Sequence, residues 1–363
     1  MNAARKTPRR ILTRLLVKPS DVRPQFENFE VIGTFNPGAI EYGDGVALLI
    51  RVVERPIEQR AGFIALPYWD FRQAQISIDW RPLSEVDLLD PRVVRLKLSG
   101  HLRLTFVSWL LVAFSRDGLS IDRFGDCPML PETPYETFGI EDPRIARFDN
   151  HYYFTYVAVS PHGIVTALAS TTDFQSFERH GIIFCPENKD VVLFPEKING
   201  QYVALHRPNP NGHFSQPEIW LARSPDLLHW GGHQRLLGSE AGWASVKVGA
   251  GTPPIRTSAG WLSLFHGNTA PKRDGFDPSD VGQYSAATLL LALDEPGQIV
   301  GMSAEPVMVA EADFERSGYL PQIVFPTALL RRGDHVDVYY GAADTATGVA
   351  RYALDELLGT VRS

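Results

Sequence analysis

Two adjacent carboxylates and an arginine lie in residues 139–144, which read Gly-Ile-Glu-Asp-Pro-Arg. Side chains of neighbouring residues in an extended chain point in opposite directions, so Glu141 and Asp142 should not enter one pocket in the same way. One carboxylate can then act on a substrate while the other anchors the backbone. Pro143 favours an extended conformation of Asp142. A salt-bridged surface turn is the alternative interpretation of this segment.

Basic side chains gather in two later segments. Lys189 and Lys197 lie in residues 186–197, and His206 and Arg207 lie in residues 205–208. Cations beside a carboxylate acid could hold an anion such as phosphate. The alternative is ordinary ion pairing among exposed loops.

Two further features complete the candidate residues. Residues 249–251 read Gly-Ala-Gly but lack the spacing and the following lysine of a Walker motif, so they favour a close approach of the backbone instead. His266 ends an apolar run and could be a ligand or a buried structural histidine. No closely spaced set of His, Cys and carboxylate residues indicates a metal site, and no cofactor is expected.

The elements that must position these residues are strands. Apolar runs rich in β-branched and aromatic residues recur along the chain between Gly, Pro, Asn and Asp, and no long segment has helical spacing. Turn-like segments recur at intervals of about 50 residues, an interval found in some β-propellers. They are marked by Asp70, Asp117, Asp173, Asp226 and Asp294. Five marks predict an all-β fold, a five-bladed β-propeller, with few helices.

Composition and chain ends limit the classes of function. A net charge of −7 and a pI of about 5.8 argue against a nucleic-acid partner. Residues 1–20 are basic and are expected to form an arm or a short helix that could contribute to a homo-oligomer. Residues 21–357 are expected to form the catalytic domain. Arg14 interrupts the apolar residues that an export signal needs, no run of about 20 apolar residues suggests a membrane span, and two cysteines cannot form a disulfide framework. These features favour the cytoplasm.

In these residues the chain resembles glycoside hydrolase family 130, which contains β-mannoside phosphorylases and β-1,2-mannosidases. The resemblance spans nearly the whole chain, from residues 35–37 to residues 339–344. Its most specific segments are residues 139–144, 188–197, 205–208 and 249–254. The family fold is a five-bladed β-propeller, which agrees with the repeat.

The resemblance implies an inverting reaction in which Asp142 is the proton donor and inorganic phosphate attacks the anomeric carbon from the opposite face. The resemblance also implies that the proton passes through a sugar hydroxyl and that no protein base is needed, because phosphate already carries its charge. The family pattern implies two groups of ligands. The phosphate-binding candidates are Arg51, Lys189, His206 and Arg207, and the substrate-binding candidates are Asn36, Glu141, Arg144, His266 and Asp344.

These features predict a phosphorylase that uses phosphate as co-substrate and forms mannose 1-phosphate from a β-mannoside. One alternative is an inverting β-1,2-mannosidase. A second is a carbohydrate-binding propeller with little catalysis, because Trp109, Leu111 and Phe114 stand where relatives often have polar residues. A third is an arabinanase-type hydrolase, which would need a second carboxylate. The long segment 267–283 could close over the channel or be a solvated loop.

Overall fold

The computed structural model describes residues 8–210, 214–239, 242–269 and 281–362. Strands dominate this part of the chain. The α-helices there are α1 (Asp313–Arg316) and α2 (Leu354–Leu358). Three 3-10 turns also occur: η1 (Pro19–Asp21), η2 (Leu83–Glu85) and η3 (Pro134–Glu136). The prediction of an all-β chain with few helices is confirmed. Neither α-helix is long and apolar enough to span a membrane.

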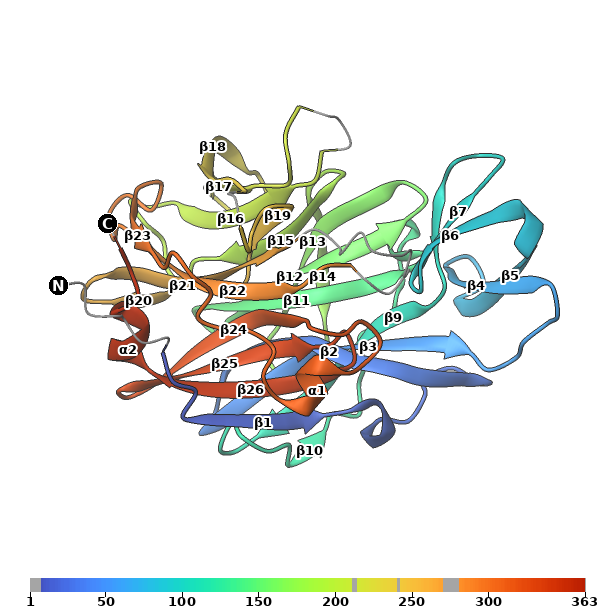
Figure 1. Ribbon diagram of the computed structural model, residues 1–363, viewed down its shortest axis with the longest axis horizontal. Helices are drawn as coiled ribbons and strands as arrows, with labels where there is room; N and C mark the ends of the chain where they lie inside the picture. Colours follow the sequence, from blue (N-terminus) through green and yellow to red (C-terminus); the bar gives the residue numbers. More distant parts are fainter. Residues whose placement is uncertain (1–7, 211–213, 240–241, 270–280, 363) are drawn as a thin grey trace.

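Most strands belong to five antiparallel sheets (Figure 1). The first contains β2 (Phe29–Tyr42), β3 (Gly45–Pro56), β9 (Val107–Ser115) and β10 (Arg123–Phe124). The second contains β11 (Gly139–Phe148), β12 (His151–Ser160), β13 (Gly163–Thr171) and β14 (Glu178–Phe184). The third contains β15 (Asn188–Leu193), β16 (Tyr202–Pro208), β17 (Ile219–Ser224) and β18 (Gly231–Leu237).

The fourth sheet contains β19 (Lys247–Ala250), β21 (Gly260–Asn268), β22 (Tyr284–Leu291) and β23 (Ile299–Met302), and β20 (Ile255–Thr257) pairs with β21. The fifth contains β24 (Val324–Arg332), β25 (His335–Ala342), β26 (Ala346–Ala353) and β1 (Leu12–Val17). It therefore joins a strand from the beginning of the chain to three strands from its end.

The role of β1 corrects the prediction for the N-terminal segment. We expected an arm or a short helix over residues 1–20, but Leu12–Val17 pair with β26 from Leu12 opposite Arg351 to Val17 opposite Thr347. Three of these six residues are Leu and two are β-branched, and Val17 is fully buried. Edge pairing and burial therefore outweigh the basic character of the segment. Residues 1–7 lie outside the described part.

Apolar clusters fill the spaces between consecutive sheets. Ala47 and Leu49 of β3 pack against the second sheet, whereas Leu48 and Ile50 of the same strand pack against the fifth. Further clusters join the second sheet to the third, the third to the fourth and the fourth to the fifth. Both faces of these sheets are buried, which explains why their strands are continuous apolar runs in the sequence.

Residues 57–106 form an insertion between β3 and β9 of the first sheet. It contains the hairpin β4 (Phe63–Asp70) and β5 (Gln75–Pro82), followed by a sheet of β6 (Val86–Asp90), β7 (Val93–Leu96) and β8 (Leu102–Leu104). In Figure 1 these strands extend to one side of the five sheets.

The insertion shows that one of the five marks of the predicted repeat was wrong. Asp117, Asp173 and Asp226 accept backbone N–H bonds in the turns between the third and fourth strands of the first three sheets, as expected. Asp294 lies in the corresponding connection between β22 and β23. Asp70 was assigned wrongly, because it caps the hairpin turn of the insertion by accepting from the Arg72 and Gln73 amides.

Candidate active site

A single large cavity of about 1080 Å³ collects most of the predicted site residues. They reach it from β2, β3, β11, β15, β16 and the turn between β25 and β26. The predicted residues in its wall are Asn36, Arg51, Glu141, Asp142, Lys189, Arg207 and Asp344. The insertion forms much of the remaining wall, with side chains that include Tyr68, Trp80, Arg92, His101, Arg103 and Phe106.

Three polar residues enter the cavity from equivalent β-bulges. Asn36, Asp142 and Asp190 lie in the first strands of the first three sheets, each at an interruption of the register with the second strand. Their φ angles are 51°, 51° and 53°. Asn and Asp tolerate this left-handed conformation better than other residues with a Cβ. A bulge redirects a side chain, and here it turns a polar group toward the cavity in each sheet.

The bulge overturns two expectations for residues 139–144. Asp142 is left-handed and not extended, since the bulge outweighs the preference set by Pro143. Glu141 and Asp142 also line the same cavity, because the irregularity breaks the strand alternation that should separate them.

Arg51 binds both carboxylates. Its Nη2 donates to Glu141 Oε1 at 2.7 Å and its Nη1 to Asp142 Oδ1 at 3.1 Å, and all three side chains are largely buried. Burial alone would lower the pKa of Arg51, but Glu141, Asp142 and Asp344 raise it, so the guanidinium stays charged. Asn36 Nδ2 donates to the same Asp142 oxygen at 2.9 Å. Within the described residues no donor reaches Asp142 Oδ2, which remains available to a substrate.

A second charged group lies on the third and fourth sheets. Arg207 Nη1 is 2.5 Å from Asp190 Oδ2, and His266 Nε2 is 3.2 Å from the same oxygen. Burial would raise the pKa of Asp190, but Arg207, His266 and Arg144 together hold it well below its ordinary value. Lys189 also lines the cavity and forms no ion pair with a described residue.

The glycine at position 249 fits the close approach that the sequence predicted. A Cβ built there would lie 2.6 Å from the His266 ring and would also collide with the Asp190 carboxylate. Any larger residue would therefore displace the buried pair of Asp190 and His266.

Three predicted ligands lie outside the cavity wall. Arg144 is buried and donates to the carbonyl oxygens of Gly251 at 2.7 Å and Asp142 at 2.8 Å, so it joins β11 to the residue that follows β19. His266 is fully buried and packs against the Phe325 ring, 4.3 Å between centroids. The structure does not bring either side chain to the cavity surface.

His206 is the third predicted ligand that lies outside the cavity wall. Its Nδ1 lies 3.0 Å from Asn188 Nδ2, its Nε2 lies 3.1 Å from His233 Nδ1, and its ring stacks on Phe184. Burial, together with His233, lowers the pKa of His206 to about 3. A neutral ring with both nitrogens occupied is not suited to bind phosphate. The expectation that His206 binds the anion directly is therefore not supported by its position.

The unusual apolar residues of β9 lie in the core. Trp109 and Leu111 are buried in the cluster shared with the fifth sheet, and Trp109 Nε1 donates to Glu54 Oε1 at 2.8 Å. Phe114 packs on the cluster shared with the second sheet. These three residues do not form part of the cavity wall. In the long segment 267–283, residues 270–280, including Lys272, Arg273, Asp274 and Asp280, lie outside the described part.

Sequence reasoning missed Arg92. It comes from the turn between β6 and β7 of the insertion and lines the cavity. Its Nη1 lies 3.1 Å from Asp344 Oδ2 and its Nη2 lies 3.1 Å from Asp90 Oδ2. A signal was present, because residues 90–92 read Asp-Pro-Arg, the same tripeptide as residues 142–144.

Comparison with known proteins gives consistent matches. The glycoside hydrolase family 130 model, described as beta-1,4-mannooligosaccharide phosphorylase, matches residues 90–363. A beta-1,2-mannobiose phosphorylase from Listeria innocua is 38% identical over 348 residues, 94% of this chain and 95% of the relative. A 1,2-beta-oligomannan phosphorylase from Thermoanaerobacter is 36% identical over 249 residues, 68% of this chain and 78% of the relative.

One solved structure agrees with the sequence matches. The Listeria innocua beta-1,2-mannobiose phosphorylase in complex with beta-1,2-mannobiose superimposes with a TM-score of 0.89 at 38% identity, and covers 95% of this chain and 96% of its own.

Proposed function

Because the chain belongs to glycoside hydrolase family 130, we propose that it is an inverting phosphorylase that cleaves a β-1,2-linked mannoside with inorganic phosphate and releases mannose 1-phosphate. The observation that carries the proposal is the composition of one cavity, in which Asp142 lies with the cations Lys189 and Arg207. Two relatives, which match 94% and 68% of this chain, are named as phosphorylases of β-1,2-linked mannosides.

Asp142 acts as the proton donor in this proposal. Arg51 and Asn36 occupy its Oδ1, so Oδ2 carries the proton toward the substrate. The proton moves to a hydroxyl of the mannose, and the proton of that hydroxyl moves to the departing glycosidic oxygen. The bond from the anomeric carbon to that oxygen breaks while a phosphate oxygen forms a bond to the opposite face. Asp142 is left as a carboxylate and regains a proton before the next turnover.

Lys189 and Arg207 hold the phosphate. Arg207 pairs with Asp190 through Nη1 and lines the cavity together with Lys189. Arginine suits this task because its planar fork matches two phosphate oxygens at once. Phosphate brings its own negative charge, so no protein base is required.

Asn36 and Asp344 bind the mannose whose bond is cleaved, and Glu141 holds Arg51. Amide and carboxylate groups suit sugar hydroxyls, which both donate and accept hydrogen bonds. The insertion wall, with Tyr68 and Trp80, then faces the rest of the mannoside. Aromatic side chains with a polar edge are suited to the alternating apolar and polar faces of sugars.

A β-1,2-mannosidase is the second candidate, since Glu187 lines the cavity without an ion pair to any described residue. An inverting hydrolase needs such a carboxylate to activate water. Asp190 could not serve, because it is buried against Arg207 and His266.

The two functions are separated by product analysis. We expect β-1,2-mannobiose to yield α-mannose 1-phosphate only when phosphate is present, identified by phosphorus and proton NMR, and β-1,4-linked mannobiose to react more slowly. Release of free mannose at the same rate without phosphate would replace the phosphorylase with a mannosidase. In that case Glu187→Gln should abolish activity.

We also infer that the five sheets are the blades of a five-bladed β-propeller formed by residues 21–357 and closed by β1. Support comes from five apolar clusters. Four of them join consecutive sheets from the first to the fifth, and one joins the fifth sheet to the first. A cytoplasmic location is likewise proposed, and the free thiols of Cys127 and Cys185 support it. Assembly into a homo-oligomer stays a prediction.

A further inference from the structure

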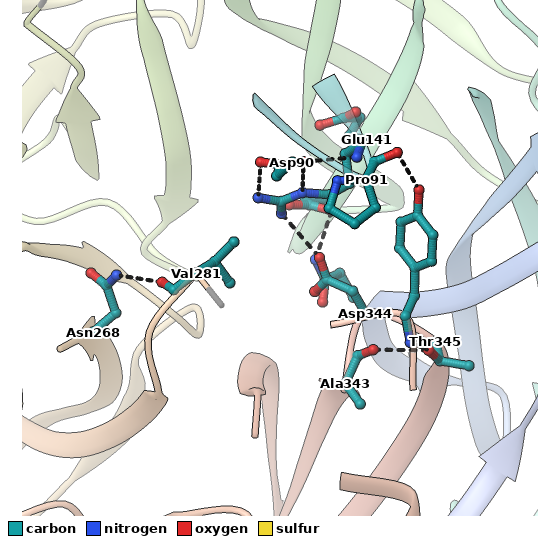
Figure 2. Close-up of polar contacts among 12 residues, drawn as sticks. Asp90, Pro91, Glu141, Asn268, Val281, Ala343, Asp344 and Thr345 are labelled. Carbon is teal, nitrogen blue, oxygen red and sulfur yellow. Dashed lines mark hydrogen bonds and ion pairs between the residues drawn. The ribbon is translucent and has the colours of Figure 1, made fainter. Parts of the chain in front are cut away.

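The turn of the insertion at residues 90–92 contacts the hairpin that carries Asp344. Figure 2 shows Asp90 and Pro91 beside Asp344 and Thr345, although some 250 residues separate the two segments. Arg92 Nη1 donates to Asp344 Oδ2 at 3.1 Å, and the side chains of Arg92 and Asp344 are 29% and 13% exposed. The contact therefore lies at the cavity wall and within reach of a ligand.

Asp90 holds the guanidinium of Arg92 in the orientation that contacts Asp344. Asp90 Oδ1 accepts from the Arg92 backbone amide at 2.7 Å and from its Nε at 3.2 Å, while Oδ2 accepts from Nη2 at 3.1 Å. These bonds use one side of the planar fork and leave Nη1 directed at Asp344. An arginine held in this way loses little further conformational freedom when it binds a second carboxylate.

A second connection joins the same two segments. Tyr319 Oη donates to the Pro91 carbonyl at 2.7 Å, and the Tyr319 amide donates to Thr345 Oγ1 at 2.7 Å. Thr345 Oγ1 in turn donates to the Ala343 carbonyl at 2.8 Å. Ala343 and Asp344 are both left-handed, with φ of 50° and 46°. The strained hairpin is therefore held on both sides of Asp344.

We propose that Arg92 is a positioning residue, which fixes the Asp344 carboxylate in the orientation that binds the mannose to be cleaved. The inference rests on the proposed function, because it takes Asp344 as a ligand of that sugar. It gives the insertion a part in catalysis as well as in forming the wall.

The charges around Asp344 give this role a distinctive pH signature. The groups that face it are Arg92 from the insertion, Arg51 from β3 and Asp142 from β11. Burial raises the pKa of Asp344, Arg92 and Arg51 lower it, and Asp142 raises it. Loss of Arg92 therefore raises the pKa further, and a higher pH is needed to keep Asp344 ionised. An adjacent arginine typically changes the pKa of an aspartate by about one to three units.

The test compares Arg92→Met and Arg92→Lys with Arg95→Gln, an exposed arginine of β7 in the same insertion. Phosphorolysis of β-1,2-mannobiose is followed from pH 4.5 to 8.5. We expect Arg92→Met to lower kcat/KM by about 100-fold, as a displaced ligand would. The acid limb of the pH profile of this variant should move to higher pH by about one unit or more. Arg92→Lys should restore the pH limb and part of the rate, because it keeps the charge but not the fork. Arg95→Gln should match the wild type.

Thermal melts of each variant show that it is folded. A structural role alone would lower the rate without moving the acid limb, and that result would overturn the proposal. So would an Arg92→Met enzyme whose kcat/KM stays within about threefold of the wild type while Asp142→Asn is inactive. If the wild-type enzyme itself fails to form mannose 1-phosphate, the proposed function is at fault, and a change in mannose affinity measured by calorimetry then decides the role of Arg92.

Discussion

Among the described residues, donors reach only one oxygen of Asp142, and this asymmetry supports its proposed role as the proton donor. Arg51 and Asn36 both reach Oδ1, while the backbone bulge presents the carboxyl group to the cavity. An asparagine can keep the same Oδ1 contacts and the same left-handed backbone. It cannot donate an acidic proton.

We therefore expect Asp142→Asn to lower kcat by about 10²- to 10⁴-fold, the usual contribution of general acid catalysis, while affinity for the mannoside changes little. Single-turnover assays and calorimetry with β-1,2-mannobiose measure the two effects. Glu187→Gln, which alters another cavity carboxylate, is the matched control and should keep most of the activity. Retention of more than a tenth of kcat in Asp142→Asn would rule out this residue as the acid.

His206 has a different role at the residue scale, since it affects stability. Its pKa in the folded protein is about 3 because of burial and the neighbouring His233, against about 6.5 for an ordinary histidine. Between these values the unfolded chain binds a proton that the folded chain does not. The free energy of unfolding therefore falls as the pH drops from about 6.5 to about 3.

Replacement of His206 by glutamine removes this titration. We expect urea unfolding of His206→Gln to lose less stability between pH 7.5 and pH 4.5 than the wild type loses. His151→Gln, at an exposed histidine, should lose as much as the wild type. An equal loss in His206→Gln and the wild type would contradict the assignment. The KM for phosphate should change less in His206→Gln than in Arg207→Met, because only Arg207 lines the cavity.

At the scale of elements, the bulges decide what sequence reasoning could find. The motif around Asp142 and the cations Lys189 and Arg207 were predicted, and the structure brings them into one cavity. Strand alternation failed for Glu141 and Asp142 because an inserted residue shifts the pattern by one position. No property of a single sequence indicates that a histidine such as His206 points away from the cavity.

The insertion escaped prediction for another reason. Its turn residue Asp70 resembles the marks of the repeat, so the segment looked like part of a regular unit. Arg92 meets Asp344 only after the chain has folded, and local patterns cannot reveal a contact between segments so far apart. The fifth sheet has no such turn between its third and fourth strands, because its fourth strand, β1, comes from the start of the chain.

The bulge at Asp190 allows a test of how a buried charge stabilises these elements. Asp190→Asn keeps the side-chain shape and the left-handed backbone but leaves Arg207 without its counter-charge. Breaking one side of a buried ion pair costs about 3–5 kcal/mol, so we expect the free energy of unfolding to fall by about that amount. Glu30→Gln, in the exposed pair with Arg55, should cost less than about 1 kcal/mol. Urea denaturation at pH 7.5 measures both, and equal costs would contradict the assigned burial of Asp190.

At the scale of the whole molecule, the sheets depend on one another, because each apolar cluster is shared by two of them. β1 completes the fifth sheet and carries Val17 into the cluster that joins this sheet to the first. Arg10, just before β1, pairs with the buried Glu315 of α1 at 2.6 Å. The beginning of the chain is thus joined to its last sheet.

Val17→Ala tests whether the packing of β1 stabilises the whole structure. The side chain is fully buried, so its truncation should lower the free energy of unfolding by about 2 kcal/mol, the lower part of the range for large core residues. Leu15→Ala in the same strand is the matched control, because Leu15 is 40% exposed and its loss should cost about 0.5 kcal/mol or less. If the clusters couple all sheets, circular dichroism, tryptophan fluorescence and activity should be lost in one transition that moves as a unit in Val17→Ala. A separate early transition that leaves activity intact would mean that β1 and its sheet unfold independently of the site.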